Sequence, residues 1–229
     1  MDTPTVLFLG KAEDSGCARA LELVQTVFPD SHYYLGKRGD PLPAQALTWQ
    51  GDYLLSYLSP WIMPESLLKQ ASRGAINFHP GPPEYPGIGC TNFALYNGET
   101  NYGVTCHHMA ARVDSGPIIA VRTFPIYPRD TVWTLTQRCY AYLLPLFHDM
   151  VAALASNQPL PKSDRHWTRR PYKRAELDAL CRITPDMSEA EVVRRVRAVT
   201  FPGAPGAYVE IAGFKFSFSP DANAGGSAT

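Results

Sequence analysis

The sequence predicts an α/β protein built on a doubly wound sheet. Short apolar runs of strand length alternate with segments of helical periodicity over the first half of the chain. Strands that alternate with helices form parallel β-α-β units, and in such sheets ligands bind at the carboxyl ends of the strands. The 229 residues are enough for one medium domain with a small appendage. A content of 45% hydrophobic and 18% charged residues is typical of a compact soluble protein.

The first half of the chain contains four strand candidates. The first is Thr5–Gly10, where an apolar run ends in glycine, and it is followed by a helix that Asp14 or Ser15 can cap. Further strands are expected at residues 31–36, Asp52–Ser59 and Gly74–His79, with a short helix at residues 64–71.

The second half begins with two β-rich runs, Tyr102–Met109 and Pro117–Ile126, which a polar loop joins. A long amphipathic helix is expected at Thr131–Ser156, with Pro145 as a candidate bend. After an irregular basic segment, "SEAEVVRRVRAV" has capping-box spacing and predicts a last helix. "GAYVEIAGFKFSF" predicts a small β-hairpin. The expected division is a main domain at residues 1–160, a small C-terminal subdomain at 161–220 and a disordered tail at 221–229.

Charge and cysteine usage limit the classes of function. Lys+Arg and Asp+Glu both number 21, so a large nucleic-acid-binding surface is not expected. No C-x-x-C pair occurs among the five scattered cysteines, so no metal site is predicted, and free thiols suit a reducing cytoplasm. The N-terminus lacks the features of a signal peptide, and no apolar run approaches the length of a membrane span. The expected location is therefore cytoplasmic, without membrane contact.

Three polar residues stand out as candidates for catalysis: Asn77, His79 and Asp114. Asn77 and His79 lie two residues apart at the end of a predicted strand, so their side chains point to the same side. Asp114 follows in the loop between the two later strands and can return beside them. This trio suits acyl transfer to an amine, because an imidazole can accept the amine proton while an amide and an imidazolium stabilise the oxyanion. On spacing alone, a structural histidine and a plain Asp-Ser-Gly turn remain the alternative.

The segments "NFHPGPPEYPG" and "YGVTCHHMAARVDSGPII" resemble the formyltransferases that use 10-formyltetrahydrofolate. That family carries N-x-H-P, a loop rich in Pro, Tyr and Gly, and then D-x-G-x-I. The resemblance runs from about Leu54 to Ile126 and resumes at "VRAVTFPGAPGAYVEIAGFKF". It implies a Rossmann-like catalytic domain followed by a small helix plus β-hairpin, with Asn77, His79 and Asp114 as catalytic residues. The loop after His79 is one residue shorter than usual in the family, which reshapes the wall of the acceptor pocket.

The resemblance also implies where the formyl donor binds. "SPWIM" and the loop before Asp114 match the two segments that enclose the pterin of 10-formyltetrahydrofolate, which is released as tetrahydrofolate. A turn with core side chains is the alternative for the first segment. The residues implied in this pocket are Trp61, Ile62, Met63, Ala110, Ala111, Arg112 and Val113.

Three acceptors compete within the family: methionyl-tRNA, glycinamide ribonucleotide and a nucleotide-linked amino sugar. The short C-terminal region and the "PGAY" block favour the sugar enzymes, and the loop is most similar to enzymes acting on GDP-perosamine, a 4-amino-4,6-dideoxy sugar nucleotide of bacterial O-antigen and lipopolysaccharide. A basic segment could meet the diphosphate, although a solvated connector is the alternative. The implied substrate contacts are Lys11, Tyr85, Trp167, Arg169, Arg170, Tyr172 and Lys173.

Two further expectations concern partners. A homodimer is expected from the family. The alternative from a different functional class is that the protein is a non-catalytic member of the family that senses folate or a nucleotide sugar. A pure binder, however, would not require all three polar residues of the trio.

Overall fold

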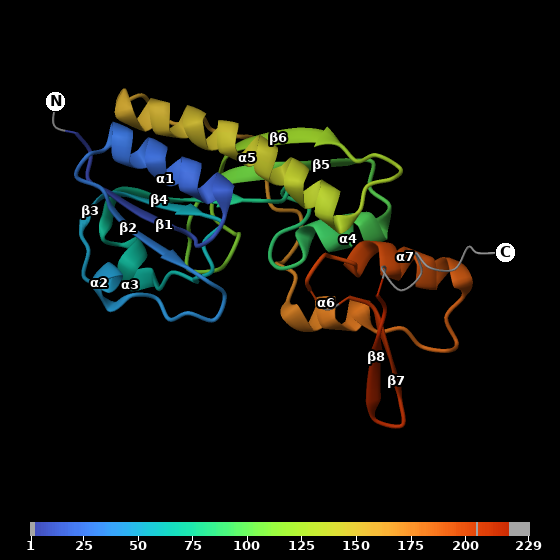
Figure 1. The fold of residues 1–229 in the computed structure, drawn as a ribbon. Coiled ribbons are helices and arrows are strands. Elements are labelled where there is room, and N and C mark those ends of the chain that lie inside the picture. The colour runs from blue at the N-terminus through green and yellow to red at the C-terminus, as the bar shows by residue number, and fades with distance from the viewer. Residues whose placement is uncertain (1–2, 205, 220–229) are drawn as a thin grey trace.

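The computed structural model describes residues 3–204 and 206–219 and contains a mixed six-stranded sheet flanked by helices (Figure 1). The tail expected at 221–229 lies outside the described residues. The strand order is β2-β1-β3-β4-β5-β6. The strands are β1 (Val6–Lys11), β2 (His32–Gly36), β3 (Gly51–Tyr57), β4 (Ala71–His79), β5 (Asn101–His108) and β6 (Ile118–Pro125). The helices are α1 (Ser15–Val27), α2 (Ala44–Leu47), α3 (Glu65–Leu68), α4 (Cys90–Asn97), α5 (Val132–Ala155), α6 (Arg174–Cys181) and α7 (Glu189–Val199). The α/β fold class expected from the sequence is confirmed.

The direction of β5 differs from a purely parallel sheet. β1 to β4 are parallel, as predicted, but β5 runs antiparallel to both β4 and β6. The loop at residues 109–117 explains the β5–β6 pairing, because it is shorter than the dozen or more residues that a parallel crossover needs. Helices α2, α4 and α6 were not among the predicted elements; each is eight residues or shorter and has little room for periodicity.

The two faces of the sheet are covered differently. α1 and α5 pack on one face and bury a large core that includes Phe8, Tyr57, Phe78 and Phe147 (Figure 1). α2 and α3 cover β1 and β3 on the other face over a smaller core. On that second face, loops rather than helices cover the carboxyl half of β4, and the polar residues of the site lie there.

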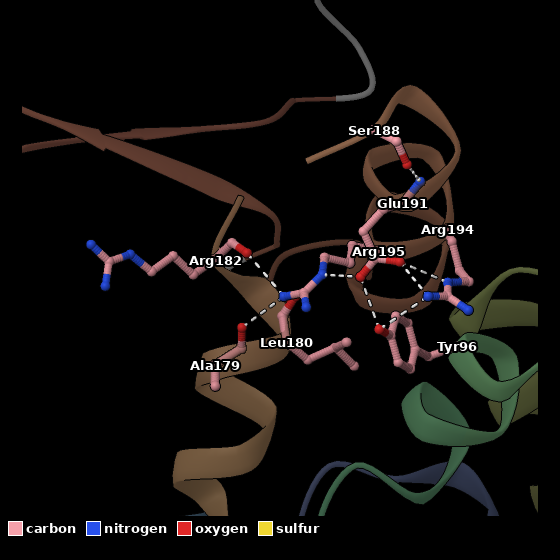
Figure 2. Close-up of polar contacts among 8 residues, drawn as sticks. All are labelled: Tyr96, Ala179, Leu180, Arg182, Ser188, Glu191, Arg194 and Arg195. Carbon is pink, nitrogen blue, oxygen red and sulfur yellow. Dashed lines mark hydrogen bonds and ion pairs between the residues drawn. The ribbon is translucent and has the colours of Figure 1, made fainter. Parts of the chain in front are cut away.

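The C-terminal helices are tied to the sheet domain by a polar network (Figure 2). Tyr96 of α4 donates a hydrogen bond of 2.8 Å to Glu191 of α7, and Glu191 also pairs with Arg194 and Arg195. Arg195 in turn donates to the carbonyls of Ala179, Leu180 and Arg182 at the end of α6. We call Tyr96, Glu191, Arg194 and Arg195 the α7 clasp.

The last strands of the described residues form a hairpin, β7 (Tyr208–Ile211) and β8 (Phe214–Ser217), which extends away from the sheet domain (Figure 1). Its register pairs Val209 with Phe216 and Ile211 with Phe214, so these four residues share one face. Ile211, Phe214 and Phe216 are each more than half exposed. Among the described residues, no helix is long and apolar enough to cross a membrane.

Candidate active site

The antiparallel pairing of β4 with β5 builds the floor of the site. Asn77 lies directly opposite His107, and His79 lies opposite Thr105, so all four side chains share one face of the sheet. The amide Nδ2 of Asn77 is 3.1 Å from Nε2 of His107. His107 was not among the predicted site residues, because only the antiparallel register brings it beside Asn77. Its one signal in the sequence is that it belongs to a strand leading into the Asp114 loop.

His79 has an acceptor beside each ring nitrogen. Nδ1 is 3.3 Å from Oδ2 of Asp114, and Nε2 is 3.0 Å from the backbone carbonyl of Tyr85. A doubly protonated ring can donate to both groups, whereas a neutral ring can donate to one only. The side chain is 5% exposed, so water does not readily replace either partner. Each ring nitrogen of His79 therefore has one oxygen acceptor beside it.

Asp114 joins the two histidines. Its Oδ1 is 3.3 Å from Nε2 of His107, and its Oδ2 accepts a 2.7 Å hydrogen bond from the backbone N–H of Gly87. Burial alone raises the pKa of Asp114, but His79, His107 and the Gly87 N–H outweigh it and lower the pKa to about 2. The carboxylate is therefore ionised at neutral pH, although only 7% of the residue is exposed. We call Asn77, His79, His107 and Asp114 the polar cluster.

The backbone around Asp114 is held in an unusual conformation. Its φ is +43°, in the left-handed region that residues with a side chain rarely adopt. Two residues later, a Cβ at Gly116 would lie 1.9 Å from the carbonyl oxygen of His108, so only glycine fits there. The Asp-Ser-Gly sequence thus allows the tight return that brings the carboxylate back over the sheet.

The loop after His79, residues 80–89, forms a rigid frame. A Cβ at Gly81 would lie 2.6 Å from Nε2 of His79 and 3.0 Å from the Tyr85 carbonyl. Thr105 donates a 2.7 Å hydrogen bond to the Gly81 carbonyl, which fixes the loop on β5. Glycine at this position therefore leaves room for the imidazole, while the prolines restrict the loop's other conformations.

The basic segment between α5 and α6, residues 157–173, forms a further wall of the site. We call it the connector. Tyr172 pairs with Gly87 in a short parallel bridge, and the N–H of Thr168 donates to the Pro83 carbonyl at 3.3 Å. Trp167 lies edge-on to both histidine rings of the polar cluster. The connector therefore packs directly on the frame of the site.

The segments expected to enclose the formyl donor lie near each other. Met63 is buried in the smaller core, and Trp61 and Met109 both pack against that core. Trp61 also donates a 3.0 Å hydrogen bond to the Asp40 carbonyl. Ile62 is 76% exposed and, with the exposed residues Ala110, Ala111, Arg112 and Val113, it offers the free surface of these segments. Met63 contributes core packing instead of free surface.

Two of the expected substrate contacts, Tyr85 and Tyr172, have side chains that pack within the protein. The Tyr85 side chain is 4% exposed and its hydroxyl donates to Glu99, so its carbonyl, and not its phenol, reaches the polar cluster. One face of the Tyr172 ring stacks on Phe93 at 3.7 Å and the other lies under Arg169 at 3.1 Å, which leaves no free face for a base. Both side chains are used in packing in this structure, and their contact with a substrate stays a prediction.

The basic side chains expected at the substrate are partly neutralised. Arg170 pairs with Glu176 at 2.8 Å, and Arg169 lies 3.9 Å from the same carboxylate. Lys11, at the carboxyl end of β1, lies 3.3 Å from Asp14. Lys173 is exposed at the start of α6. The connector thus carries more basic than acidic side chains, but some of its basic side chains already form ion pairs within the protein.

The arrangement is that of a proton-transfer and oxyanion site. An ionised carboxylate orients the imidazole of His79, and the amide of Asn77 lies two residues away on the same face. The family model for formyl transferases matches residues 50–142, the range that holds the whole polar cluster. Residues 50–142 are therefore similar to the formyl transferases of that family. This confirms the expected formyltransferase relationship and, with it, the expectation of an enzyme.

Solved structures with the formyltransferase fold cover nearly the whole chain. Rv3404c from Mycobacterium tuberculosis, an inferred sugar N-formyltransferase, has a TM-score of 0.76 and 21% identity over 94% of this chain and 96% of its own. A sugar N-formyltransferase from Shewanella sp. FDAARGOS_354 has a TM-score of 0.76 and 19% identity over 95% and 97%. An N-formyltransferase from Helicobacter canadensis, in complex with folinic acid and dTDP-3-aminofucose, has 0.70 and 19% over 93% and 85%. At these identities, the agreement concerns the fold.

Proposed function

We propose that this protein transfers a formyl group from 10-formyltetrahydrofolate to the amine of a nucleotide-linked amino sugar. The observation that carries the proposal is the polar cluster, which lies within the formyltransferase segment and holds an ionised carboxylate 3.3 Å from His79. The donor supplies the formyl carbon, and tetrahydrofolate is the product released. A binder without catalysis would have no use for this buried charge arrangement.

Each of Asn77, His79 and Asp114 is assigned a separate role in the formylation of the amine. Asn77 and His79 donate hydrogen bonds to the charge that develops on the formyl oxygen. Asp114 remains ionised and holds His79 through Nδ1. Nε2 acts as the base in its unprotonated form, so a proton that it directs at the Tyr85 carbonyl here passes to water as the amine enters. His79 can then accept the amine proton directly or through water.

The donor site is proposed between residues 60–63 and 110–113. Apolar side chains at the free edges of these segments, Ile62 and Val113, are 76% and 42% exposed. A flat pterin could bind between these two segments, because apolar side chains can cover its faces. Backbone groups of the loops can form hydrogen bonds with the donors and acceptors at its edge. The structure of the Helicobacter canadensis protein in complex with folinic acid supports the proposal that a protein of this fold binds a folate.

The acceptor is proposed to be a 4-amino-4,6-dideoxy sugar nucleotide, with GDP-perosamine for O-antigen and lipopolysaccharide as the first choice. The loop at residues 80–89 supports this assignment by its similarity to enzymes acting on that sugar, and the dTDP-3-aminofucose complex supports the class of nucleotide sugars. Lys11, Arg169, Arg170 and Lys173 are proposed to meet the diphosphate, where arginine can make forked hydrogen bonds. Methionyl-tRNA and glycinamide ribonucleotide are the competing acceptors.

The test is a screen of GDP-, UDP- and dTDP-linked 3- and 4-amino sugars with 10-formyltetrahydrofolate. Release of tetrahydrofolate and formation of the formamide are followed together, with His79→Ala and Asp114→Asn as site variants. We expect turnover with a 4-amino sugar, and a loss of most kcat in both variants with the fold intact. No formamide with any nucleotide sugar, or near wild-type kcat in either variant, contradicts the proposal.

A further inference from the structure

Trp167 is the one tryptophan of the connector, and it contacts three parts of the site. Its ring centroid is 5.9 Å from that of His79 and 5.0 Å from that of His107, with interplanar angles of 72° and 89°. Its Nε1–H donates a 2.8 Å hydrogen bond to the carbonyl of Gly116, two residues after Asp114. A single half-buried side chain thus contacts both histidines and the loop that carries the carboxylate.

Neighbouring contacts hold this part of the connector on the site. Arg165, two residues before Trp167, pairs with Glu84 at 2.6 Å. Thr168, the next residue, donates its backbone N–H to the Pro83 carbonyl at 3.3 Å. Both partners belong to the loop at residues 80–89 that frames His79. The indole is therefore fixed from both sides of its own position in the chain.

This placement has two physical consequences. The edge of an apolar ring against His79 and His107 keeps water from them, which agrees with their exposures of 5% and 2%. Excluding water strengthens the attraction between these rings and the carboxylate of Asp114. The bond to Gly116 also restrains the loop next to the strained backbone of Asp114.

We propose that Trp167 is a positioning residue that covers His79 and His107 and anchors the Asp114 loop. The connector is then a third wall of the active site, in addition to a surface for nucleotide. The consequence for catalysis rests on the proposed function, whereas the cover and the anchor are properties of the free protein. The two are tested separately.

The cover is tested by modification of histidines with diethylpyrocarbonate, followed by mass spectrometry of peptides. Trp167→Ala should raise the modification rates of His79 and His107 roughly tenfold by opening their surroundings to water. His32 and His148 are already exposed and should react at the wild-type rate. Trp133→Ala is the matched control, because that tryptophan packs against Phe201. Unchanged rates at both site histidines in Trp167→Ala overturn the cover.

The anchor is tested by Trp167→Phe, which keeps an aromatic ring but removes the N–H donor. Histidine modification should stay near the wild-type rate, while kcat falls roughly tenfold and the KM for the acceptor changes little. A wild-type kcat overturns the anchor, and a raised acceptor KM at constant kcat shows a substrate contact instead. This variant also decides the matter if Trp167→Ala does not fold, which reaction of the buried thiol of Cys139 would reveal. If the wild-type protein forms no formamide, the proposed function fails, but the modification result still stands.

Discussion

At the scale of single residues, His79 has more acceptors than a neutral imidazole can satisfy. The carboxylate of Asp114 and the carbonyl of Tyr85 each lie beside one ring nitrogen. Gly81 is the residue that lets the ring fit between them, since any side chain there would meet Nε2. Both ring nitrogens of His79 are thus held next to oxygen acceptors in the free protein.

His107→Ala should lower kcat roughly tenfold or more, equivalent to at least about 1.4 kcal/mol of barrier. The variant removes the ring whose Nε2 lies 3.1 Å from the Asn77 amide and 3.3 Å from the Asp114 carboxylate, while the substrates keep their own contacts. Steady-state kinetics with the best acceptor of the screen measures the effect. His148→Ala, on the exposed face of α5, is the control and should keep wild-type activity. A changed KM with normal kcat would argue against this role.

Asp114→Asn should remove a contribution to stability that depends on pH. The pKa of about 2 lies below the ordinary value of 3.8, so the ionised carboxylate stabilises the fold by about 2 kcal/mol above pH 5. That contribution falls as the pH drops through the range between the two values, and about half is lost by pH 3. Urea unfolding of both proteins at pH 6 and pH 3 checks this. An equal difference between the proteins at both pH values contradicts the prediction.

At the scale of secondary-structure elements, polar contacts join pieces that are distant in sequence. The connector contacts the loop at residues 80–89 through the bridge between Tyr172 and Gly87. The α7 clasp joins α4, α6 and α7 (Figure 2). Two arginines and Tyr96 lower the pKa of Glu191 to about 2, so the carboxylate at the centre of the clasp stays charged. The C-terminal helices also bury Leu180, Ala198 and Val199 in the large core, and the clasp adds polar contacts to that packing.

Glu191→Ala should destabilise the C-terminal helices by about 1 kcal/mol, since a partly exposed charged network contributes modestly. The melting temperature should fall by roughly 2–4 °C, measured by circular dichroism. Glu189→Ala is the matched control, because Glu189 is exposed on the first turn of the same helix. A larger loss in the control than in Glu191→Ala would show that negative charge at the helix N-terminus, and not the clasp, dominates.

At the scale of the whole molecule, the hairpin presents an apolar face to solvent. Val209, Ile211, Phe214 and Phe216 share this face, whereas Glu210 and Lys215 lie on the other. A two-stranded hairpin alone is marginally stable in water, so a covering surface would stabilise it. We propose that a second copy of the chain supplies that surface, which would place the hairpin in the interface of the expected homodimer.

Phe214→Ser combined with Phe216→Ser should convert the dimer to monomer. Each buried phenylalanine contributes roughly 1.5–3 kcal/mol to association, so losing two weakens the dimer at least about 100-fold. Analytical ultracentrifugation of both proteins measures the change. Glu210→Ala, on the opposite face of the same hairpin, should remain dimeric. A monomeric wild-type protein at micromolar concentration contradicts the proposal.

The sequence by itself determined the alternation of strands and helices, the same-side placement of Asn77 and His79, and the loop that returns Asp114. These features depend on local periodicity and on residue types such as glycine and proline, which act within a few residues. The comparison with the formyltransferase fold agrees with this part of the prediction.

Only the tertiary structure decided the antiparallel register of β5, which places His107 opposite Asn77, and the return of the connector, which brings Trp167 over the histidines. Strand direction depends on loop lengths and on packing between segments far apart in the chain, and no local pattern encodes it. The same reason explains Tyr85 and Tyr172. The family resemblance implied substrate contacts for both side chains, whereas only the structure shows that long-range packing uses them.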